Sequence, residues 1–337
     1  MVTLKDIAQA CGVSVASVSK ALNNATDIGA DTAEKIRKTA RDLGYYPNAA
    51  ARSLKTNRTY NIGVIFEDDT DAGLAHEYFS EILEAVKTSV EAKGFDVTFI
   101  SKHIGEARMS FLEHCRYRNV DGVVIVCADF KDPSVAELVS SNIPMVTIDY
   151  VFDNVSSVVS DNVLGMRELT KYIISMGHRK IAFIHGEDTA VTKSRLASFY
   201  NVCEENGIEV PEEYIKDGRY HDPASAGAAT RELLKLKDMP TCIIYADDIS
   251  LLGGISEIER QGIRLITDIS IAGYDGISLS QMLRPRITTL HQDSKTLGVK
   301  AAELLLKQIE SPKSFIPRSI YVPGTVYPGN SVARLTL

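Results

Sequence analysis

Residues 2–24 read VTLKDIAQACGVSVASVSKALNN, a stretch that predicts two short helices joined by a tight turn. Thr3 precedes Asp6 by three positions, the spacing of a capping box, so a first helix should begin after Thr3. Ser14 can then cap a second helix over residues 15–22. This spacing is typical of a helix-turn-helix.

A third helix should complete this N-terminal head. Residues 31–34 read DTAE, another capping box, and Ile36, Ala40 and Leu43 recur at the spacing of one helix face. Gly44 is its expected stop. Three helices of this length make one small all-α domain.

The head is basic and the rest of the chain is acidic. Residues 1–58 contain nine Lys or Arg and five Asp or Glu, whereas the remainder contains 28 and 39. A basic end on an acidic body is typical of a protein that binds a polyanion at that end only.

The second helix of a helix-turn-helix enters the major groove of DNA. Val15, Ala16 and Lys20 lie on its outward side and should read the bases. Valine and alanine make apolar contacts, for instance with a thymine methyl, and lysine donates to guanine. A helical hairpin without a role in DNA binding is the alternative.

A short hinge should follow the head at residues 47–59. Residues 49–55 read AAARSLK, about two helical turns, which is too short for a stable isolated helix. Leu54 stands between Arg52 and Lys55 like an apolar wedge with phosphate-binding flanks. An alanine-rich linker is the alternative.

From residue 60 onward, apolar β-branched runs alternate with amphipathic stretches such as residues 78–93. The runs are residues 61–66, 96–101, 122–128, 145–150, 180–186, 241–246 and 270–275. This alternation predicts parallel α/β layers arranged as two doubly wound lobes. Ligands bind such lobes where the carboxyl ends of strands meet a cleft.

Acidic side chains end three of these runs. Asp149, Asp247 and Asp275 should share a cleft with Arg195 on the helix after residues 180–186. Carboxylates accept hydrogen bonds from hydroxyls and arginine donates several, so the set suits a neutral polyol, whose C–H face aromatic rings can cover. The aromatic candidates are Tyr78, Phe79 and Tyr220. Any one aspartate could instead cap a helix.

The stretches 2–24 and 44–65 (GYYPNAAARSLKTNRTYNIGVI) resemble the head, hinge and first strand of the lactose-repressor and purine-repressor (LacI/GalR-type) family of bacterial transcriptional regulators. AGYDG (272–276) and RPRITTLHQDSKTLGVKAAELLL (284–306) resemble that family's distal signatures. The resemblance therefore covers the whole chain.

This resemblance implies a helix-turn-helix domain over residues 1–46, a hinge over 47–59 and a periplasmic-binding-protein-like body over 60–337. The chain should cross between the lobes near Asp161, Gln292 and Val322. The implied N-terminal lobe comprises about 60–161 and 293–322, and the C-terminal lobe about 162–292 and 323–337.

The resemblance also implies two sets of site residues. The DNA-binding set is Thr3, Ser14, Val15, Ala16, Ser17, Lys20, Asn23, Arg52, Leu54 and Lys55, with Leu54 opening a central base step in the minor groove. The effector-binding set is Tyr78, Phe79, Asp149, Arg195, Tyr220, Asp247 and Asp275.

The three aspartates resemble the sugar-responsive members more than the purine-responsive one. The loop over residues 67–77 is longer and more acidic than the matching loop of the purine repressor. This leaves the roles of Asp68, Asp69 and Asp71 open.

Several classes of function are disfavoured. The sequence contains no phosphate-binding loop, dinucleotide fingerprint, zinc-protease motif or nucleophile elbow, so we expect no enzyme and no cofactor. Its seven histidines show no ligand spacing and its five cysteines form no C-x-x-C pair, so no metal site is predicted. No secretion signal or membrane span is visible, which favours the reducing cytoplasm.

The sequence thus predicts a homodimeric repressor of carbohydrate-utilisation genes. It should bind a near-palindromic double-stranded operator and respond allosterically to a small neutral sugar held between the lobes. The alternatives are a receptor-type sugar-binding protein without a DNA function, and a regulator that responds to a purine or a phosphosugar.

Overall fold

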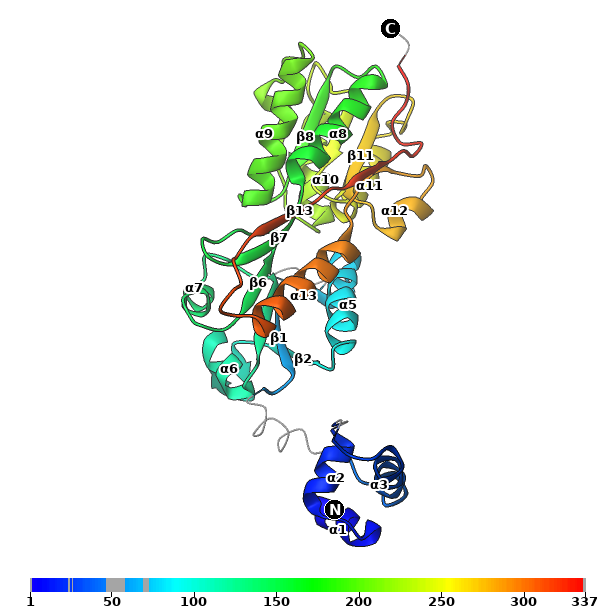
Figure 1. Ribbon diagram of the computed structural model, residues 1–337. Helices are drawn as coiled ribbons and strands as arrows, with labels where there is room; N and C mark the ends of the chain where they lie inside the picture. The colour runs from blue at the N-terminus through cyan, green and yellow to red at the C-terminus, as the bar shows by residue number, and fades with distance from the viewer. Residues whose placement is uncertain (1, 24, 26, 47–57, 69–72, 336–337) are drawn as a thin grey trace. The chain divides into compact units, whose positions relative to one another are not determined.

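The computed structural model describes residues 2–23, 25, 27–46, 58–68 and 73–335 (Figure 1). It contains two compact units, residues 1–59 and residues 60–337. Arg52, Leu54 and Lys55 of the predicted hinge, and Asp69 and Asp71 of the acidic loop, lie outside the described residues.

The first unit contains three helices, α1 (Leu4–Cys11), α2 (Val15–Leu22) and α3 (Ala30–Asp42). The Thr3 hydroxyl accepts a hydrogen bond from the Asp6 amide while the Asp6 carboxylate accepts one from the Thr3 amide, which confirms the first capping box. The Ser14 hydroxyl caps α2 by accepting from the Ser17 amide. Local capping thus sets both helix starts.

The third helix departs from its prediction. It begins at Ala30 behind Gly29 without a side-chain cap, so the predicted capping box is wrong. Leu43 is 41% exposed rather than inward, because the helix ends at Asp42 and Gly44 turns the chain with a φ of +69°. Tyr45 packs against the core of this unit.

The second unit contains two lobes, each built on a six-stranded sheet. The first sheet is all parallel, in the order β13-β7-β6-β5-β1-β2. Its strands are β1 (Asn61–Phe66), β2 (Asp96–Ile100), β5 (Gly122–Cys127), β6 (Met145–Ile148), β7 (Ser156–Ser160) and β13 (Ser319–Val322). A separate hairpin pairs β3 (His103–Ile104) with β4 (Ala107–Arg108).

The second sheet has the order β14-β12-β11-β10-β8-β9, and its strands are parallel except for β14, which runs antiparallel to β12. The strands are β8 (Ile181–His185), β9 (Ile215–Asp217), β10 (Cys242–Tyr245), β11 (Ser270–Asp275), β12 (Thr288–His291) and β14 (Thr325–Tyr327).

Helices cover both faces of each sheet. In the first lobe, α5 (Glu77–Glu91) and α13 (Ser294–Glu310) share a core on one face, and α6 (Phe111–Arg118) and α7 (Pro133–Val139) share a core on the other. In the second lobe these pairs are α8 (Asn162–Ser175) with α9 (Ala190–Glu205), and α10 (Pro223–Leu233) with α11 (Asp248–Arg260). Shorter segments are α12 (Ser278–Met282) and the 3-10 turns η1 (Gly73–Ala75) and η2 (Glu212–Tyr214).

The central strands are apolar on both sides because both sides are covered. In β5, Val124 and Val126 pack toward α5 and α13, whereas Val123 and Ile125 pack toward α6 and α7. A continuous apolar run is the sequence signature of such a parallel strand. The helical head and the two doubly wound lobes confirm the predicted fold class.

Within residues 73–335 the chain passes between the lobes three times. The passages lie between β7 and α8, between β12 and α13, and between β13 and β14. Asp161 and Asp293 cap the helices that follow the first two passages. None of the helices in the described part of the chain is both long and apolar enough for a membrane span.

Candidate functional site

The outer surface of α2 carries the predicted base-reading residues. Val15 is 40% exposed, and Ala16 and Lys20 are also exposed. Val18 and Ala21, on the opposite side of the helix, are fully buried against the other helices of the head. The amphipathic pattern of α2 therefore leaves these three side chains free of the core.

Other predicted DNA-binding residues serve as helix caps. Thr3 and Ser14 cap α1 and α2. The Asn23 side-chain amide donates to the Ser19 carbonyl oxygen over 2.7 Å, at the end of α2. Lys20 forms an ion pair with Asp27, and both side chains are at least half exposed, so the pair is solvated and easily exchanged for a phosphate or a base.

A second group of predicted residues gathers where the two lobes meet, and we call it the interlobe cluster. It comprises Tyr78, Phe79 and Asp149 from the first lobe and Arg195, Tyr220, Asp247 and Asp275 from the second, with the additional members His76, His221 and Gln292. The His76 and His221 ring centroids are 3.8 Å apart across the lobes, so the two halves of the cluster are in contact.

In the first lobe, Tyr78 and Asp149 are hydrogen-bonded to each other. The Tyr78 hydroxyl donates to Asp149 Oδ2, and the Ser160 amide donates to Asp149 Oδ1 over 2.7 Å. Burial raises the pKa of the Asp149 carboxyl, although both donors act to lower it. Burial and the neighbouring Asp149 charge raise the pKa of Tyr78 well above its ordinary value, so this hydroxyl stays protonated as a donor.

In the second lobe, Arg195 is 3% exposed and held by three neighbours. Its Nε donates to Asn162 Oδ1 over 2.7 Å and its Nη1 donates to the Ala246 carbonyl oxygen over 2.9 Å. The guanidinium carbon lies 3.5 Å from the centroid of the Tyr274 ring. Packing and hydrogen bonds therefore orient this buried cation before any ligand binds.

The structure corrects the prediction that three carboxylates face a ligand, because the protein itself occupies Asp247. Its Oδ1 accepts from the amides of Ile249 and Ser250, and its Oδ2 accepts from the Ser250 hydroxyl and the His221 amide. A carboxylate has about four acceptor positions, so the protein fills all of them. Asp247 caps α11 and positions His221.

Asp275 keeps more of its acceptor capacity. It ends β11, is 7% exposed, and accepts a 2.6 Å hydrogen bond from the Gln292 side chain on Oδ1. Burial and repulsion by Asp247 raise the pKa of its carboxyl. Its backbone φ of +95° is rare for a residue with a Cβ, and such strained positions concentrate at functional sites.

Tyr220 is placed by its contact with Gly186. A Cβ atom on Gly186 would stand 2.2 Å from the Tyr220 ring, so only glycine allows the ring this position. The Tyr220 hydroxyl lies 2.8 Å from the hydroxyl of Thr192 on α9.

Sequence reasoning missed His76, His221 and Gln292. His76 ends the acidic loop, His221 follows Tyr220, and Gln292 lies within the distal signature, so each was adjacent to a predicted feature. No local spacing relates the two histidines, because one belongs to each lobe.

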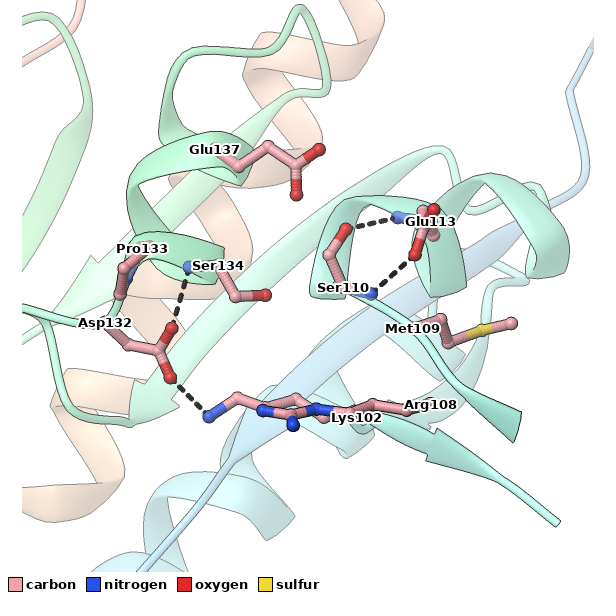
Figure 2. A pocket seen from close by; sticks show the side chains of 9 residues that line it. All are labelled: Lys102, Arg108, Met109, Ser110, Glu113, Asp132, Pro133, Ser134 and Glu137. Atoms are coloured by element: carbon pink, nitrogen blue, oxygen red, sulfur yellow. Dashed lines mark hydrogen bonds and ion pairs between the residues drawn. The ribbon is translucent and has the colours of Figure 1, made fainter. Parts of the chain in front are cut away.

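A hollow of about 610 Å³ lies elsewhere on the first lobe, beside the starts of α6 and α7 (Figure 2). Lys102 lines it, but its ammonium group pairs with Asp132 and Glu67. The protein therefore neutralises the charge of Lys102, and the remaining lining carries charges of both signs on Arg108, Glu113 and Glu137.

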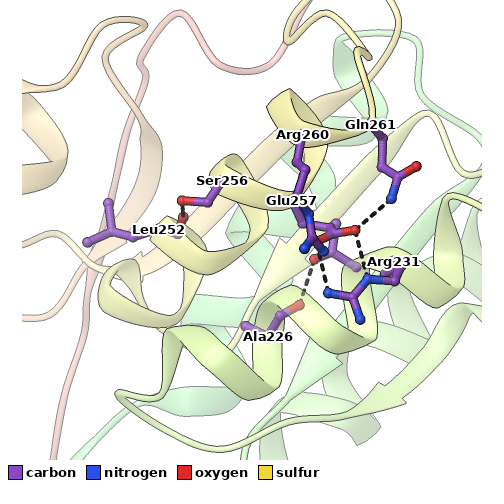
Figure 3. Close-up of polar contacts among 8 residues, drawn as sticks. Ala226, Arg231, Leu252, Ser256, Glu257, Arg260 and Gln261 are labelled. Atoms are coloured by element: carbon purple, nitrogen blue, oxygen red, sulfur yellow. Dashed lines mark hydrogen bonds and ion pairs between the residues drawn. The ribbon is translucent and has the colours of Figure 1, made fainter.

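Glu257 on α11 is a buried carboxylate outside the interlobe cluster (Figure 3). It accepts from Arg231 and Arg260 and from the side chain of Gln261. These donors lower the pKa of its carboxyl to about 2. These partners all lie on the second lobe. Glu257 is therefore a buried carboxylate with which the aspartates of the interlobe cluster can be compared in mutational tests.

Comparison with known proteins agrees with both units. Residues 3–48 match the model described as bacterial regulatory proteins, lacI family, and residues 170–332 match the periplasmic binding protein-like domain. The first match sets aside the alternative of a receptor-type protein without a DNA function.

Two similar relatives are named HTH-type transcriptional repressor PurR. The protein from Erwinia tasmaniensis is 33% identical over 339 residues, which cover 99% of this chain and 97% of that protein. The protein from Pasteurella multocida is 32% identical over 314 residues, 92% of each chain.

Two solved structures have the same fold over 98% of this chain. The lac repressor dimer bound to operator and the anti-inducer ONPF has a TM-score of 0.82 at 26% identity, with 99% of that chain covered. The transcriptional regulator CelR in complex with cellobiose has a TM-score of 0.71 at 25% identity, with 100% covered. An identity above 30% along nearly the whole length places this chain in the lacI family of bacterial regulatory proteins, as a DNA-binding transcriptional repressor and not an enzyme.

Proposed function

We propose that this repressor is controlled by a small neutral carbohydrate that binds at the interlobe cluster. The observation that carries the proposal is the pair of enclosed carboxylates, Asp149 and Asp275, near the buried cation of Arg195. Both carboxylates retain acceptor positions that their protein partners do not fill. Sugar hydroxyls are donors that would fill them.

Charge supports a neutral ligand over an anionic one. Asp149, Asp247 and Asp275 surround a single arginine, and burial already raises the pKa of Asp149 and Asp275, which shows that negative charge is disfavoured there. A phosphate group would add negative charge to the same enclosed region. Phe79 and Tyr220 supply apolar surface for the C–H face of a sugar ring.

A purine base is the second candidate, favoured by the similarity to PurR proteins along nearly the whole chain. Ring N–H groups can donate to the same carboxylates, and aromatic side chains can stack on a purine. The similarity to CelR, whose structure holds cellobiose, supports the sugar. Direct binding measurements separate the two.

We also propose that the repressor acts as a homodimer on a near-palindromic operator. Val15, Ala16 and Lys20 would read base edges, aided by Thr3, Ser14, Ser17 and Asn23, and the hinge residues Arg52, Leu54 and Lys55 would enter the minor groove. Ligand binding at the interlobe cluster would bias the DNA-competent state, and the operator would change the ligand affinity by the same factor.

A thermal-shift panel on the full-length protein, run with a chelator present, tests the ligand class. Neutral sugars, phosphosugars and purine bases would each be added at about 100 times their expected Kd, where bound ligand adds about 2.7 kcal/mol of stability. One neutral sugar should raise Tm by about 5 °C. A rise with purines or phosphosugars alone would contradict the sugar assignment.

Matched variants locate the binding residues. Asp149→Asn and Asp275→Asn each remove charge-assisted hydrogen bonds and should weaken sugar binding roughly tenfold or more. Glu257→Gln alters a buried carboxylate on the same body and should leave sugar affinity unchanged. Equal losses in all three variants would indicate a general structural effect and would remove the cluster assignment.

The hinge assignment has its own test. Leu54→Ala should weaken operator binding, measured by fluorescence anisotropy, while sugar affinity stays intact. Unchanged operator affinity in this variant would remove the wedge role of Leu54.

A further inference from the structure

Three potential metal ligands converge within the interlobe cluster. One nitrogen of His76, one nitrogen of His221 and one carboxylate oxygen of Asp275 all lie within 4.8 Å of one another. His76 precedes α5 in the first lobe, whereas His221 precedes α10 and Asp275 ends β11 in the second. Local spacing predicted no metal site, because these ligands come from three distant segments.

Three of the four ring nitrogens of His76 and His221 have no hydrogen-bond partner among the described residues. His76 is 4% exposed, and both of its ring nitrogens are buried without a partner, as is Nδ1 of His221. A buried polar group without a partner destabilises the folded protein. An occupant that binds these nitrogens would remove that cost.

The surroundings favour a cation as that occupant. The charges of Asp275, Asp247 and Asp68 act on His76, and Arg195, whose charge also acts on Asp275, already donates to Asn162 and to the Ala246 carbonyl oxygen.

The donor set selects the kind of cation. Two imidazole nitrogens with one carboxylate suit zinc and its first-row neighbours, whereas calcium and magnesium prefer oxygen ligands. The ligands are also oriented: Gln292 donates to Asp275 Oδ1, and Asp247 accepts from the His221 amide over 2.9 Å. Such supporting bonds are a regular feature of metal sites.

We propose that His76, His221 and Asp275 bind one divalent transition-metal ion of the zinc class, which links the two lobes. Three protein ligands leave a coordination position open for water or for a ligand oxygen. The ion would stabilise the contact between the two lobes. The Glu77 carboxylate already joins the lobes, because it accepts a hydrogen bond from the Ser278 amide over 2.7 Å. The proposal goes beyond the sugar assignment and does not depend on it.

Zinc titration of the chelator-treated full-length protein, without sugar, tests this site by calorimetry. We expect one ion per chain. His76→Gln and His221→Gln should each weaken zinc binding by about tenfold or more. His185→Gln is the matched control and should bind zinc like the wild type, because His185 already has Gly186 and Asp217 as partners.

Cobalt substitution gives a second readout that does not depend on variants. Bound Co²⁺ should show visible absorption bands of nitrogen and oxygen ligation, without the intense near-ultraviolet bands of thiolate ligation. Thiolate bands would overturn the proposal by assigning the ion to cysteines, as would absent zinc binding or equal affinity in the histidine variants. If His76→Gln weakens sugar binding while no metal binds, the histidines contact the sugar and the metal proposal fails alone.

Discussion

The predicted base-reading face of α2 and the interlobe cluster place their polar groups in opposite environments. Lys20 and its partner Asp27 are both at least half exposed, so water screens the charges and either can be released at little cost. Arg195 and Asp275 are at most 7% exposed, and their charges depend on protein partners. Substitutions on the outer face of α2 should therefore change DNA binding without changing stability, whereas substitutions in the interlobe cluster should change both ligand binding and stability.

The strongest test of this contrast is Arg195→Met. The change leaves Asn162 Oδ1 and the Ala246 carbonyl oxygen buried without a donor, so the free energy of unfolding should fall by about 3 kcal/mol. Ligand binding should be lost as well. Urea denaturation measures the first effect and thermal shift the second.

Arg167→Met is the control for this variant. Arg167 pairs with Glu205 through two hydrogen bonds on a partly exposed surface, so its loss should lower the free energy of unfolding much less than the loss of Arg195 does. Equal losses of unfolding free energy in Arg195→Met and Arg167→Met would contradict the expected difference between buried and exposed charges.

Lys20→Ala tests the other side of the comparison. Loss of one good base contact should weaken operator binding by about 2 kcal/mol, roughly 30-fold, and relax the base preference at one position. Its stability cost should stay below about 0.5 kcal/mol. Anisotropy with a panel of single-base operator variants measures both affinity and preference.

Lys38→Ala gives the matched comparison, since Lys38 is an exposed lysine on α3 outside the predicted base-reading set. It should reduce affinity uniformly across operator sequences and leave the preference unchanged. An unchanged preference in Lys20→Ala would remove that residue from base reading.

Glu257→Gln sharpens the comparison, because Glu257 is buried without belonging to a predicted site. Its arginine partners are 41% and 59% exposed, which weakens the pairs, so the variant should lose only about 1 kcal/mol. Operator and sugar affinity should be unchanged. A loss of either function would show that burial alone, rather than membership of the cluster, couples stability to function.

Acidification should remove the stability difference between the wild type and Glu257→Gln. The pKa of the Glu257 carboxyl is about 2 in the folded protein, below its ordinary value of 4.5. Its contribution to stability is thus complete above pH 4.5 and is lost as the pH falls toward 2. The stability difference between wild type and Glu257→Gln should narrow below about pH 4.5, and a difference that grows there would contradict the folded pKa.

Much of the fold was predictable because its signals are local. Thr3 with Asp6 and Ser14 with Ser17 set helix starts through neighbours three residues away. The apolar runs at residues 61–66 and 270–275 coincide with β1 and β11. Short polar strands gave weaker signals: β7 contains three serines and only two valines, and it was not predicted.

The failures also have local causes. Residues 31–34 satisfy the capping-box pattern, yet the N-cap of α3 is Gly29, two residues before Asp31, and no side chain caps the helix. Asp247 ends a strand and also starts a helix, and only the structure shows that capping uses its whole acceptor capacity.

Local signals in the chain were enough to predict the helix-turn-helix, the two doubly wound lobes and the strand-end positions of Asp149, Asp247 and Asp275. These follow from capping pairs and apolar periodicity, which act over a few residues. Tertiary structure alone brought His76 to His221 and separated the saturated Asp247 from Asp149 and Asp275. His76 and His221 are more than a hundred positions apart, and the His221 amide that completes the donors to Asp247 comes from another loop, so neither contact leaves a local pattern in the chain.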